Sequence, residues 1–227
     1  DRSPVVEDPP RPRPLPAGFD LACEKVSFRR PERPDPILAD VDLVVPEGAE
    51  RVISRPSGWG KSTLADLLLR VRDPDAGAIR LGGVDLRDLA LADLRRVVAL
   101  VPQHPHVFAA SLGENLRAFA PEASEAELER ALDAVGLARL RADLPEGLAT
   151  FVGERGAALS GGEARRLALA RVLLRPEVRL VVLDEPTEHL DPQTARAVIA
   201  GPRRATAGKS RLVFAHRRAG EADPWGE

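Results

Sequence analysis

The feature that most restricts the fold of this chain is a glycine-rich turn at residues 57–63, Ser-Gly-Trp-Gly-Lys-Ser-Thr. A strand-like segment at 51–54 precedes the turn, and a helical pattern at 64–71 follows it. A phosphate chain needs inward-pointing amides at a helix start, glycines at the close approach, a lysine for the terminal phosphates and a hydroxyl for magnesium. The turn therefore predicts a phosphate site formed by Ser57, Gly58, Trp59, Gly60, Lys61, Ser62 and Thr63. The alternative interpretation is a surface turn that caps the helix.

Three positions of the turn are informative beyond its spacing. Lys61 is one of only three lysines among 33 basic residues, the rest being arginine. The chain therefore has the compact ammonium group at the position where it would bind a phosphate. Arg55 stands where the usual pattern opens with glycine, and Trp59 stands where a small residue is usual. Because glycine often serves in left-handed backbone, we expect strain at Arg55 if that conformation is needed.

A second element is the apolar run Leu180–Leu183, which is followed by Asp184 and Glu185. Ligands of open α/β sheets bind beyond the carboxyl ends of the strands, where these two acids would lie. We expect Asp184 to hold the magnesium shell through water and Glu185 to orient or deprotonate an attacking water. Taken alone, two adjacent acids after a strand are also common turn residues.

A third element is the run Leu159-Ser160-Gly161-Gly162-Glu163. Ser160 and Glu163 have the spacing of a capping box, so a structural helix start explains both residues. That interpretation leaves Gly161 and Gly162 unexplained, since glycine costs roughly 1 kcal/mol against alanine in a helix. The two glycines favour close approach of a phosphate or another backbone to the free amides of this turn.

Strand-like and helix-like segments alternate along most of the chain, which predicts an α/β fold with a largely parallel sheet. The helix at 124–135 has a capping box, Ser124 with Glu127, and a left-handed end at Gly136. The expected strands are 19–28, 41–45, 51–54, 78–81, 97–101, 180–183 and 211–215, and the expected helices are 64–71, 124–135, 160–174 and 192–205.

Composition excludes several classes of partner and site. A net charge of -2 and a pI near 6.2 offer no basic footprint, so we expect no nucleic-acid partner. The apolar runs are far shorter than the roughly 20 residues of a membrane helix, and Cys23 is the only cysteine. Residues 1–18 are rich in proline and predict an extended, poorly packed linker. The chain contains no methionine, so we expect it to be part of a longer polypeptide.

The order of these motifs resembles the nucleotide-binding domain of ABC transporters over residues 19 to about 218. Residues 159–163 match the family signature, and residues 150–156 resemble a loop typical of exporters. The resemblance implies roles for further positions, which are Gln103 (glutamine loop, catalysis and magnesium), Asp191 (dimer contact), His216 (catalytic switch histidine) and Arg30 (in place of the aromatic residue that stacks on adenine).

The resemblance also implies an architecture and a mechanism. The fold would be a RecA-like P-loop NTPase core with an N-terminal antiparallel β-subdomain and a helical subdomain inserted at about 104–165. The ATPase domain would occupy 19–227, ending short of the family's closing strands and helix, and 1–18 would lead from a transmembrane domain. ATP with Mg²⁺ would be held between Lys61 and Ser62 of one domain and Ser160 of a second domain, at the cytoplasmic face of the bacterial inner membrane.

A narrower resemblance, carried by residues 184–191 and 216–220, is to CydC. CydC is one subunit of the heterodimeric exporters that supply cysteine and glutathione for cytochrome bd assembly. The narrower resemblance implies that the transported molecule is a thiol and that the partner subunit is CydD-like. Two alternatives stay open. One is a regulatory copy that binds ATP but hardly hydrolyses it, and the other is a soluble ABC ATPase of DNA repair or translation.

Overall fold

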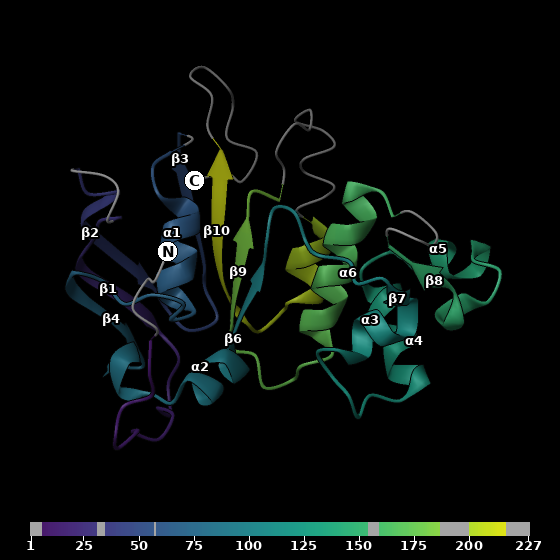
Figure 1. The fold of residues 1–227 in the computed structure, drawn as a ribbon, viewed down its shortest axis with the longest axis horizontal. Coiled ribbons are helices and arrows are strands. Elements are labelled where there is room, and N and C mark those ends of the chain that lie inside the picture. The colour runs from purple at the N-terminus through teal and green to yellow at the C-terminus, as the bar shows by residue number, and fades with distance from the viewer. Residues whose placement is uncertain (1–5, 31–34, 57, 154–158, 187–199, 217–227) are drawn as a thin grey trace. The chain divides into compact units, whose positions relative to one another are not determined.

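The computed structural model describes residues 6–30, 35–56, 58–153, 159–186 and 200–216 (Figure 1). The described chain divides into two compact units. The first unit contains the residues up to 100 together with 177–186 and 208–216. The second unit contains 101–176 and 200–207. Two segments far apart in sequence thus complete the first unit.

The first unit has an antiparallel sheet with the strand order β2-β1-β4-β5. Its strands are β1 (Leu21–Phe28), β2 (Leu38–Val45), β4 (Ala76–Leu81) and β5 (Val84–Asp85). Leu21 lies in register with Val45 on one side and with Leu81 on the other. All three side chains are buried, so this face of the sheet is the core face.

The second sheet of this unit has the strand order β3-β10-β9-β6, and β10 runs parallel to both of its neighbours β3 and β9. The strands are β3 (Glu50–Arg55), β10 (Ser210–His216), β9 (Leu180–Asp184) and β6 (Val98–Val101). The central strands are continuous apolar runs because strands of a parallel sheet are covered on both faces. The carboxyl ends of β3, β9 and β10 therefore meet at one edge.

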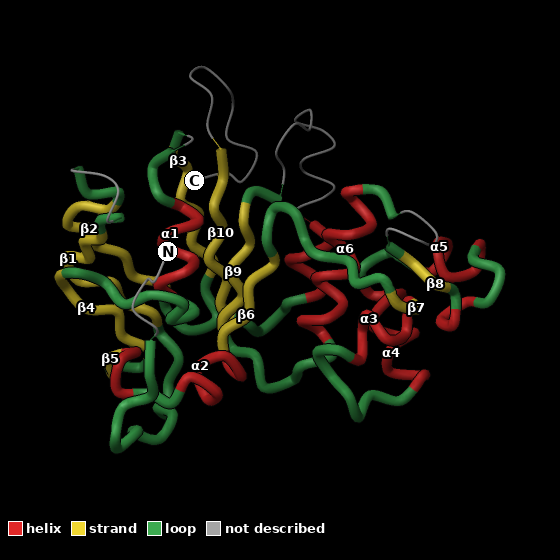
Figure 2. The backbone as a smooth tube through the Cα atoms, viewed as in Figure 1, coloured by secondary structure: helices red, strands yellow, loops and turns green. Residues whose placement is uncertain are grey.

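Helix α1 (Lys61–Leu68) lies between the two sheets (Figure 2). Its residues Leu64, Leu67 and Leu68 are almost completely buried and share one apolar core with strands of both sheets. Two further elements of this unit are η1 (Leu86–Asp88) and α2 (Leu91–Val97). The burial of α1 on its apolar face holds the glycine-rich turn, which precedes it, at the edge of the parallel sheet.

The proline-rich segment before β1 is attached to the first unit. The backbone of Arg13 bridges to that of Leu89, and its amide donates to the carbonyl of Asp88. Asp8 accepts a hydrogen bond from the amide of Leu91, and Leu15 packs against the core. These contacts tie the segment to η1 and α2, which is closer packing than the sequence predicts. Its role as a linker stays a prediction.

The second unit is mainly helical. Its elements are β7 (Ala110–Ser111), α3 (Leu112–Arg117), α4 (Glu125–Ala134), α5 (Ala138–Asp143), η2 (Gly147–Ala149), β8 (Phe151–Val152) and α6 (Gly161–Leu173). Helix α6 packs against α3 and α4. Arg171 of α6 is buried, where it donates hydrogen bonds to the carbonyls of Asn115 and His106 and to the side-chain oxygen of Asn115.

The sequence prediction located the main strands and three helices within a few residues. The phosphate-turn helix begins at Lys61, three residues before the predicted start at Leu64. The prediction omitted α2, α3 and α5, which are only six or seven residues long. Most of the helix expected at 192–205 lies outside the described residues, and its last part, 200–205, is helical. Among the described helices, none combines the length and apolar character that a bilayer span requires.

Candidate functional site

The glycine-rich turn connects the end of β3 to the start of α1, as the sequence predicts. Gly58 and Gly60 have φ angles of 82° and 104°, in the left-handed region that favours glycine. A Cβ atom on Gly60 would lie 2.7 Å from Leu38 Cδ2 and 2.9 Å from Ile37 Cγ2. Gly60 is therefore required twice, by its backbone conformation and by its contact with the start of β2. Ser57 lies outside the described residues.

Lys61 is the first residue of α1, and only 5% of its side chain is exposed. Its Nζ atom donates to the carbonyl oxygens of Arg55 (2.8 Å) and Pro56 (3.3 Å). The same atom lies 2.8 Å from Oε1 of Glu185. The lysine ammonium is thus held at the centre of the turn by two carbonyls and one carboxylate, a position in which it could bind a terminal phosphate.

Glu185 follows the end of β9, and 12% of its side chain is exposed. Its φ of 46° is unusual for a residue with a side chain, and such conformations cluster at functional sites. The amide of Glu185 donates to the carbonyl of Phe214 in β10, which holds this turn against the neighbouring strand. Tertiary pairing of β9 with β10 therefore sets the direction in which Glu185 leaves the sheet.

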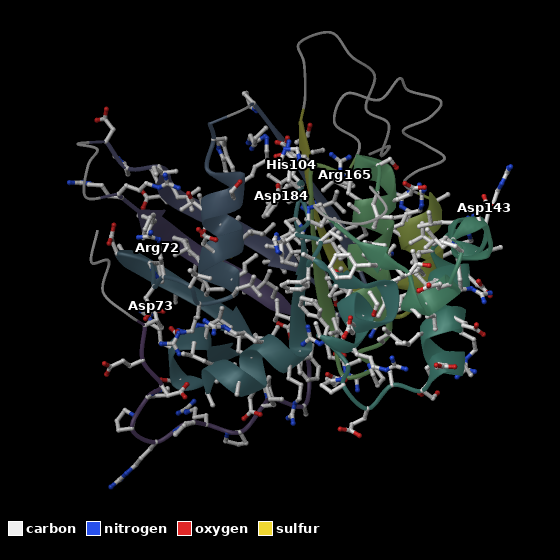
Figure 3. All side chains as sticks on the ribbon, turned by 45° about the vertical axis from the view of Figure 1, so that its right-hand side comes forward. Arg72, Asp73, His104, Asp143, Arg165 and Asp184 are labelled. Carbon is white, nitrogen blue, oxygen red and sulfur yellow. The ribbon has the colours of Figure 1, made fainter. Side chains whose placement is uncertain are left out.

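Asp184 is the last residue of β9 and is half-buried (Figure 3). Ser62 is exposed on the first turn of α1, and Thr63 beside it is buried. Both Asp184 and Ser62 belong to the first unit and offer oxygen atoms, the donors that Mg²⁺ prefers. The chemistry of this donor set fits the magnesium ion that the sequence predicts.

Arg55 does not have the strained backbone that the sequence analysis considered. It is the last residue of β3, it lies in register with His216 of β10, and it is absent from the described residues with positive φ. The expectation failed because the strand continues through this position, where an extended conformation suits any residue. The carbonyl of Arg55 then accepts a hydrogen bond from Lys61.

Arg30 is exposed just beyond the end of β1, and Phe28 before it is a buried core residue, as expected. Burial raises the pKa of Asp66 in α1, while the charges of Arg72 and Arg30 oppose that rise. Arg30 therefore lies close enough to α1 to act on one of its carboxylates. Its role in binding a nucleotide remains a prediction.

The signature turn forms the capping box that its spacing predicts. The Ser160 hydroxyl donates to Oε2 of Glu163 (2.7 Å), the Ser160 amide donates to the same oxygen (2.8 Å), and the Glu163 amide donates back to the hydroxyl (3.3 Å). The hydrogen bond from the Ser160 side chain, and then that from its amide, hold the pKa of Glu163 below its usual value. The carboxylate is therefore kept charged at the N-terminus of α6.

The capping box does not explain the two glycines that follow Ser160. Among the described residues, nothing lies within 4 Å of a Cβ atom placed on Gly161. At Gly162, the nearest atom is Nη1 of Arg166 at 3.6 Å, an ordinary contact. Packing within the described parts of the chain thus leaves room for side chains at both positions, so the open surface at this helix start is available to a ligand.

Gln103 lies in the second unit and is half-buried. Its carbonyl oxygen accepts a hydrogen bond from Nε of Arg165 at 3.0 Å. Arg165 lies on α6 (Figure 3). Sequence analysis missed Arg165, although it follows the signature by two residues. An arginine in a helix rich in alanine and leucine is only a weak signal for such a contact. In sequence, it cannot be distinguished from an arginine exposed on the surface.

The remaining predicted positions are only partly described. The backbone of His216 ends β10 and pairs with Arg55, which brings it to the same sheet edge as Glu185. Asp191 and residues 154–156 of the exporter-like loop lie outside the described residues. Their roles remain predictions.

Comparisons with known proteins assign this arrangement to a family. Residues 38–188 match the family described as ABC transporter. The mitochondrial potassium channel ATP-binding subunit of Xenopus tropicalis is 40% identical over 213 residues, 90% of this chain and 31% of that protein. The mitochondrial iron-sulfur clusters transporter ATM1 of Candida glabrata is 37% identical over 201 residues, 88% of this chain and 27% of that protein.

A solved structure gives the same result. The structure of a bacterial Atm1-family ABC exporter with ATP bound matches with a TM-score of 0.83 and 34% sequence identity, covering 94% of this chain and 37% of that chain. The chain thus spans about a third or less of the length of the two curated relatives.

Proposed function

Because the chain belongs to the ABC transporter family and forms its ATPase domain, we propose that it binds ATP at the turn after β3 and hydrolyses it to power export. The observation that carries this proposal is the 2.8 Å contact between Lys61 and Glu185. This contact brings together the lysine that would bind the terminal phosphates and the carboxylate that would activate the attacking water.

In the proposed reaction, Lys61 binds the terminal phosphates, and the amides at the start of α1 hold the phosphate chain. Ser62 and Asp184 would hold Mg²⁺, which when bound neutralises charge on the phosphates. When the phosphates bind Lys61, they replace the Glu185 carboxylate as the ionic partner of the lysine. Glu185 then accepts a proton from the water that attacks the terminal phosphate, and His216 helps to place that water.

A second ATPase domain completes the proposed site. Ser160, Gly161, Gly162 and Glu163 of one domain would face the ATP bound at Lys61 of the other, and Asp191 would contribute to the dimer contact. Support comes from the open surface at Gly161, which lies at the N-terminus of α6, where dipole and amides attract an anion. Differential affinity of ATP for the closed dimer would drive closure, and hydrolysis would reset it.

We further propose that residues 1–18 lead from a transmembrane domain of the same polypeptide, and that the ATPase works at the cytoplasmic face of a bacterial inner membrane. The chain covers only 31% and 27% of two curated relatives, which supports a longer protein. We propose no nucleic-acid partner, because a chain with a net charge of -2 has no excess of basic residues to bind phosphates.

The narrower proposal concerns the cargo. The similarity of residues 184–191 and 216–220 to CydC supports export of cysteine or glutathione for cytochrome bd assembly, with a CydD-like partner. The test is ATP-dependent uptake of radiolabelled glutathione into inverted vesicles that contain the full transporter. Uptake of a multidrug substrate but not of either thiol would reject this cargo.

The central experiment measures phosphate release by the assembled transporter for the natural sequence and for Glu185→Gln. We expect turnover to fall at least about 100-fold, because a proton acceptor in the transition state typically contributes 10²–10⁴-fold. An unchanged rate would remove Glu185 from catalysis and favour a copy that binds ATP without hydrolysing it.

A further inference from the structure

The segment before β1 contacts the end of α1 that lies opposite the phosphate turn. We call residues 7–16 of this segment the strap. The carbonyl oxygen of Glu7 accepts a hydrogen bond from Nη2 of Arg70, which lies two residues beyond α1 (3.2 Å). Towards the other end of the strap, Leu15 packs against the core of the first unit. The strap is therefore attached near both of its ends.

The strap also supplies the hydrogen bond that caps α2. The N-cap residue of this helix is Ala90, and no side chain at that position accepts a hydrogen bond. Instead, Oδ1 of Asp8 accepts one from the amide of Leu91 at 2.6 Å, from a position 83 residues earlier in the chain. A carboxylate at this point satisfies a free amide and interacts favourably with the helix dipole. Asp8 thus holds the strap at the start of α2.

Helix α2 is in turn bonded to the end of α1. Arg95 of α2 donates from Nε to the carbonyl of Leu69 (3.2 Å) and from Nη2 to the carbonyl of Arg70 (3.1 Å). Carbonyl groups at the end of a helix have no partner within the helix, so a donor from another element stabilises them. The strap therefore reaches the end of α1 by two routes, directly through Glu7 and indirectly through Asp8 and α2.

Arg70 is the residue at which the two routes meet. Its φ of 47° is left-handed, at a position after the helix where glycine is usual. Its side chain is only 4% exposed, and besides the Glu7 carbonyl it donates to the carboxylate of Asp73 and to the carbonyls of Leu86 and Leu89. A left-handed conformation is unfavourable for arginine, and these hydrogen bonds offset that cost. Removal of the strap would take one of these acceptors away.

Helix α1 connects Arg70 to the phosphate turn. It has only eight residues, from Lys61 to Leu68, and most of them are buried. The orientation of α1 therefore sets the direction of Lys61 and of the first amides, which form the proposed phosphate site. A helix that is held at its far end loses less freedom when a phosphate binds at its start. Preorganisation of this kind increases affinity.

We infer that docking of the strap on Arg70 and α2 is coupled to ATP binding at the phosphate turn. The docked strap strengthens ATP binding, and displacement of the strap weakens it. The inference rests on the proposed function, because it concerns the regulation of the same phosphate site. Coupling between two sites is reciprocal, so bound ATP also holds the strap more firmly in place.

The first experiment titrates the 227-residue chain with a non-hydrolysable ATP analogue in a calorimeter. Asp8→Ala removes the carboxylate that caps α2 and should weaken binding about fivefold, at the lower end of usual couplings between sites. Asp8→Asn keeps an oxygen that can accept the hydrogen bond and should lose less affinity. Glu7→Ala is the matched control, because it removes one negative charge at the neighbouring position and leaves the backbone carbonyl that Arg70 uses. It should leave affinity unchanged.

The second experiment follows the strap itself by hydrogen exchange of two amides. The Arg13 amide donates to the carbonyl of Asp88, and the Leu91 amide donates to Asp8. In the natural chain, the saturating analogue should slow exchange of both amides about fivefold, because linkage requires the same factor in both directions. In Asp8→Ala without nucleotide, the Arg13 amide should exchange faster, which reports release of the strap.

Equal affinity of the natural chain and of an Asp8→Ala variant with a released strap would overturn the inference and leave the proposed function intact. Unchanged exchange of both amides at saturating analogue would also overturn it. If Asp8→Ala does not release the strap, exchange in the natural chain decides alone. If the natural chain does not bind the analogue, or if Lys61→Ala binds it unchanged, the proposed phosphate site fails and the inference falls with it.

Discussion

Nζ of Lys61 lies 2.8 Å from Oε1 of Glu185, in an ion pair whose two side chains are only 5% and 12% exposed. A phosphate and the Glu185 carboxylate therefore compete for the same ammonium. Separating such a pair leaves a poorly solvated charge unless a new partner replaces the old one. The terminal phosphates of ATP would be that partner.

This competition predicts that Glu185→Gln binds ATP more tightly while it hydrolyses ATP more slowly. Loss of the carboxylate charge removes the ionic partner that competes with the phosphates for Lys61, so we expect affinity to rise about three- to tenfold. Calorimetric titration of the 227-residue chain with a non-hydrolysable ATP analogue measures this effect. Glu122→Gln, at an exposed carboxylate, is the control and should leave affinity unchanged. Weaker binding by Glu185→Gln would contradict the competition.

A second prediction concerns Glu163, whose carboxylate accepts a hydrogen bond from the Ser160 hydroxyl. Glu163→Gln removes one negative charge from the turn and weakens the hold on that hydroxyl, which makes it a better phosphate donor. We expect dimerisation of the chain at saturating ATP analogue to become about three- to tenfold stronger in sedimentation experiments. Glu127→Gln makes the same change in the capping box of α4 and is the matched control. Equal effects of both changes would assign the result to helix capping alone.

A third prediction is a dependence of stability on alkaline pH. Burial, and then the charge of Asp42, raise the pKa of the Cys23 thiol from 9.0 to about 12. The folded state keeps the thiol proton to higher pH than the unfolded state does. The contribution of the thiol to the free energy of unfolding is therefore fully present below about pH 9. It is lost between about pH 9 and 12, by up to about 1.4 kcal/mol per pH unit.

The measurement is urea unfolding at pH 8, 9.5 and 11 for the natural chain and for Cys23→Ala. The difference in unfolding free energy between the two proteins should change with pH in this window, with the natural chain losing more stability. A parallel pH dependence in both proteins would show that the thiol does not titrate as its burial requires. Iodoacetamide at pH 8.5 should modify Cys23 only after unfolding.

A fourth prediction concerns Arg171, the buried arginine of α6. Its guanidinium donates three hydrogen bonds and lies 5.4 Å and 5.0 Å from the ring centres of Phe108 and Phe119. Burial lowers the pKa of Arg171 to about 10, so the group remains charged near neutral pH. Arg171→Gln should lower the free energy of unfolding by about 2–4 kcal/mol, because buried carbonyls lose their donors.

Urea unfolding of the second unit's helices, followed by circular dichroism, measures the effect. Arg171→Lys should recover only part of the loss, since a lysine cannot reproduce the planar fork. Arg139→Gln, at a side chain that is 94% exposed and paired with Asp143, should cost less than about 0.5 kcal/mol. A similar small cost at Arg171 would show that its buried contacts do not stabilise the unit.

The turn at Gly58–Thr63, the acids after β9 and the capping box of α6 were predictable because each is a local pattern. Local backbone conformation and nearest-neighbour hydrogen bonds decide such features, as at Gly60 and Ser160. The short helices α2 and α3 were not predictable from pattern, since six or seven residues contain too few turns to show a period. Arg171 was missed for a different reason, because burial of a charged side chain depends on partners distant in sequence.

The sequence by itself determined the α/β class, the family and the order of the phosphate turn, the signature and the acidic strand end, because these depend on residue type and spacing. Only the tertiary structure decided that Lys61 pairs with Glu185, that Arg55 continues a strand without strain, and that Asp8 caps a helix 83 residues later in the chain. The physical reason is that parallel pairing of β9 and β10 brings distant segments to one sheet edge. Contacts of this kind arise from packing and pairing, which no local pattern records.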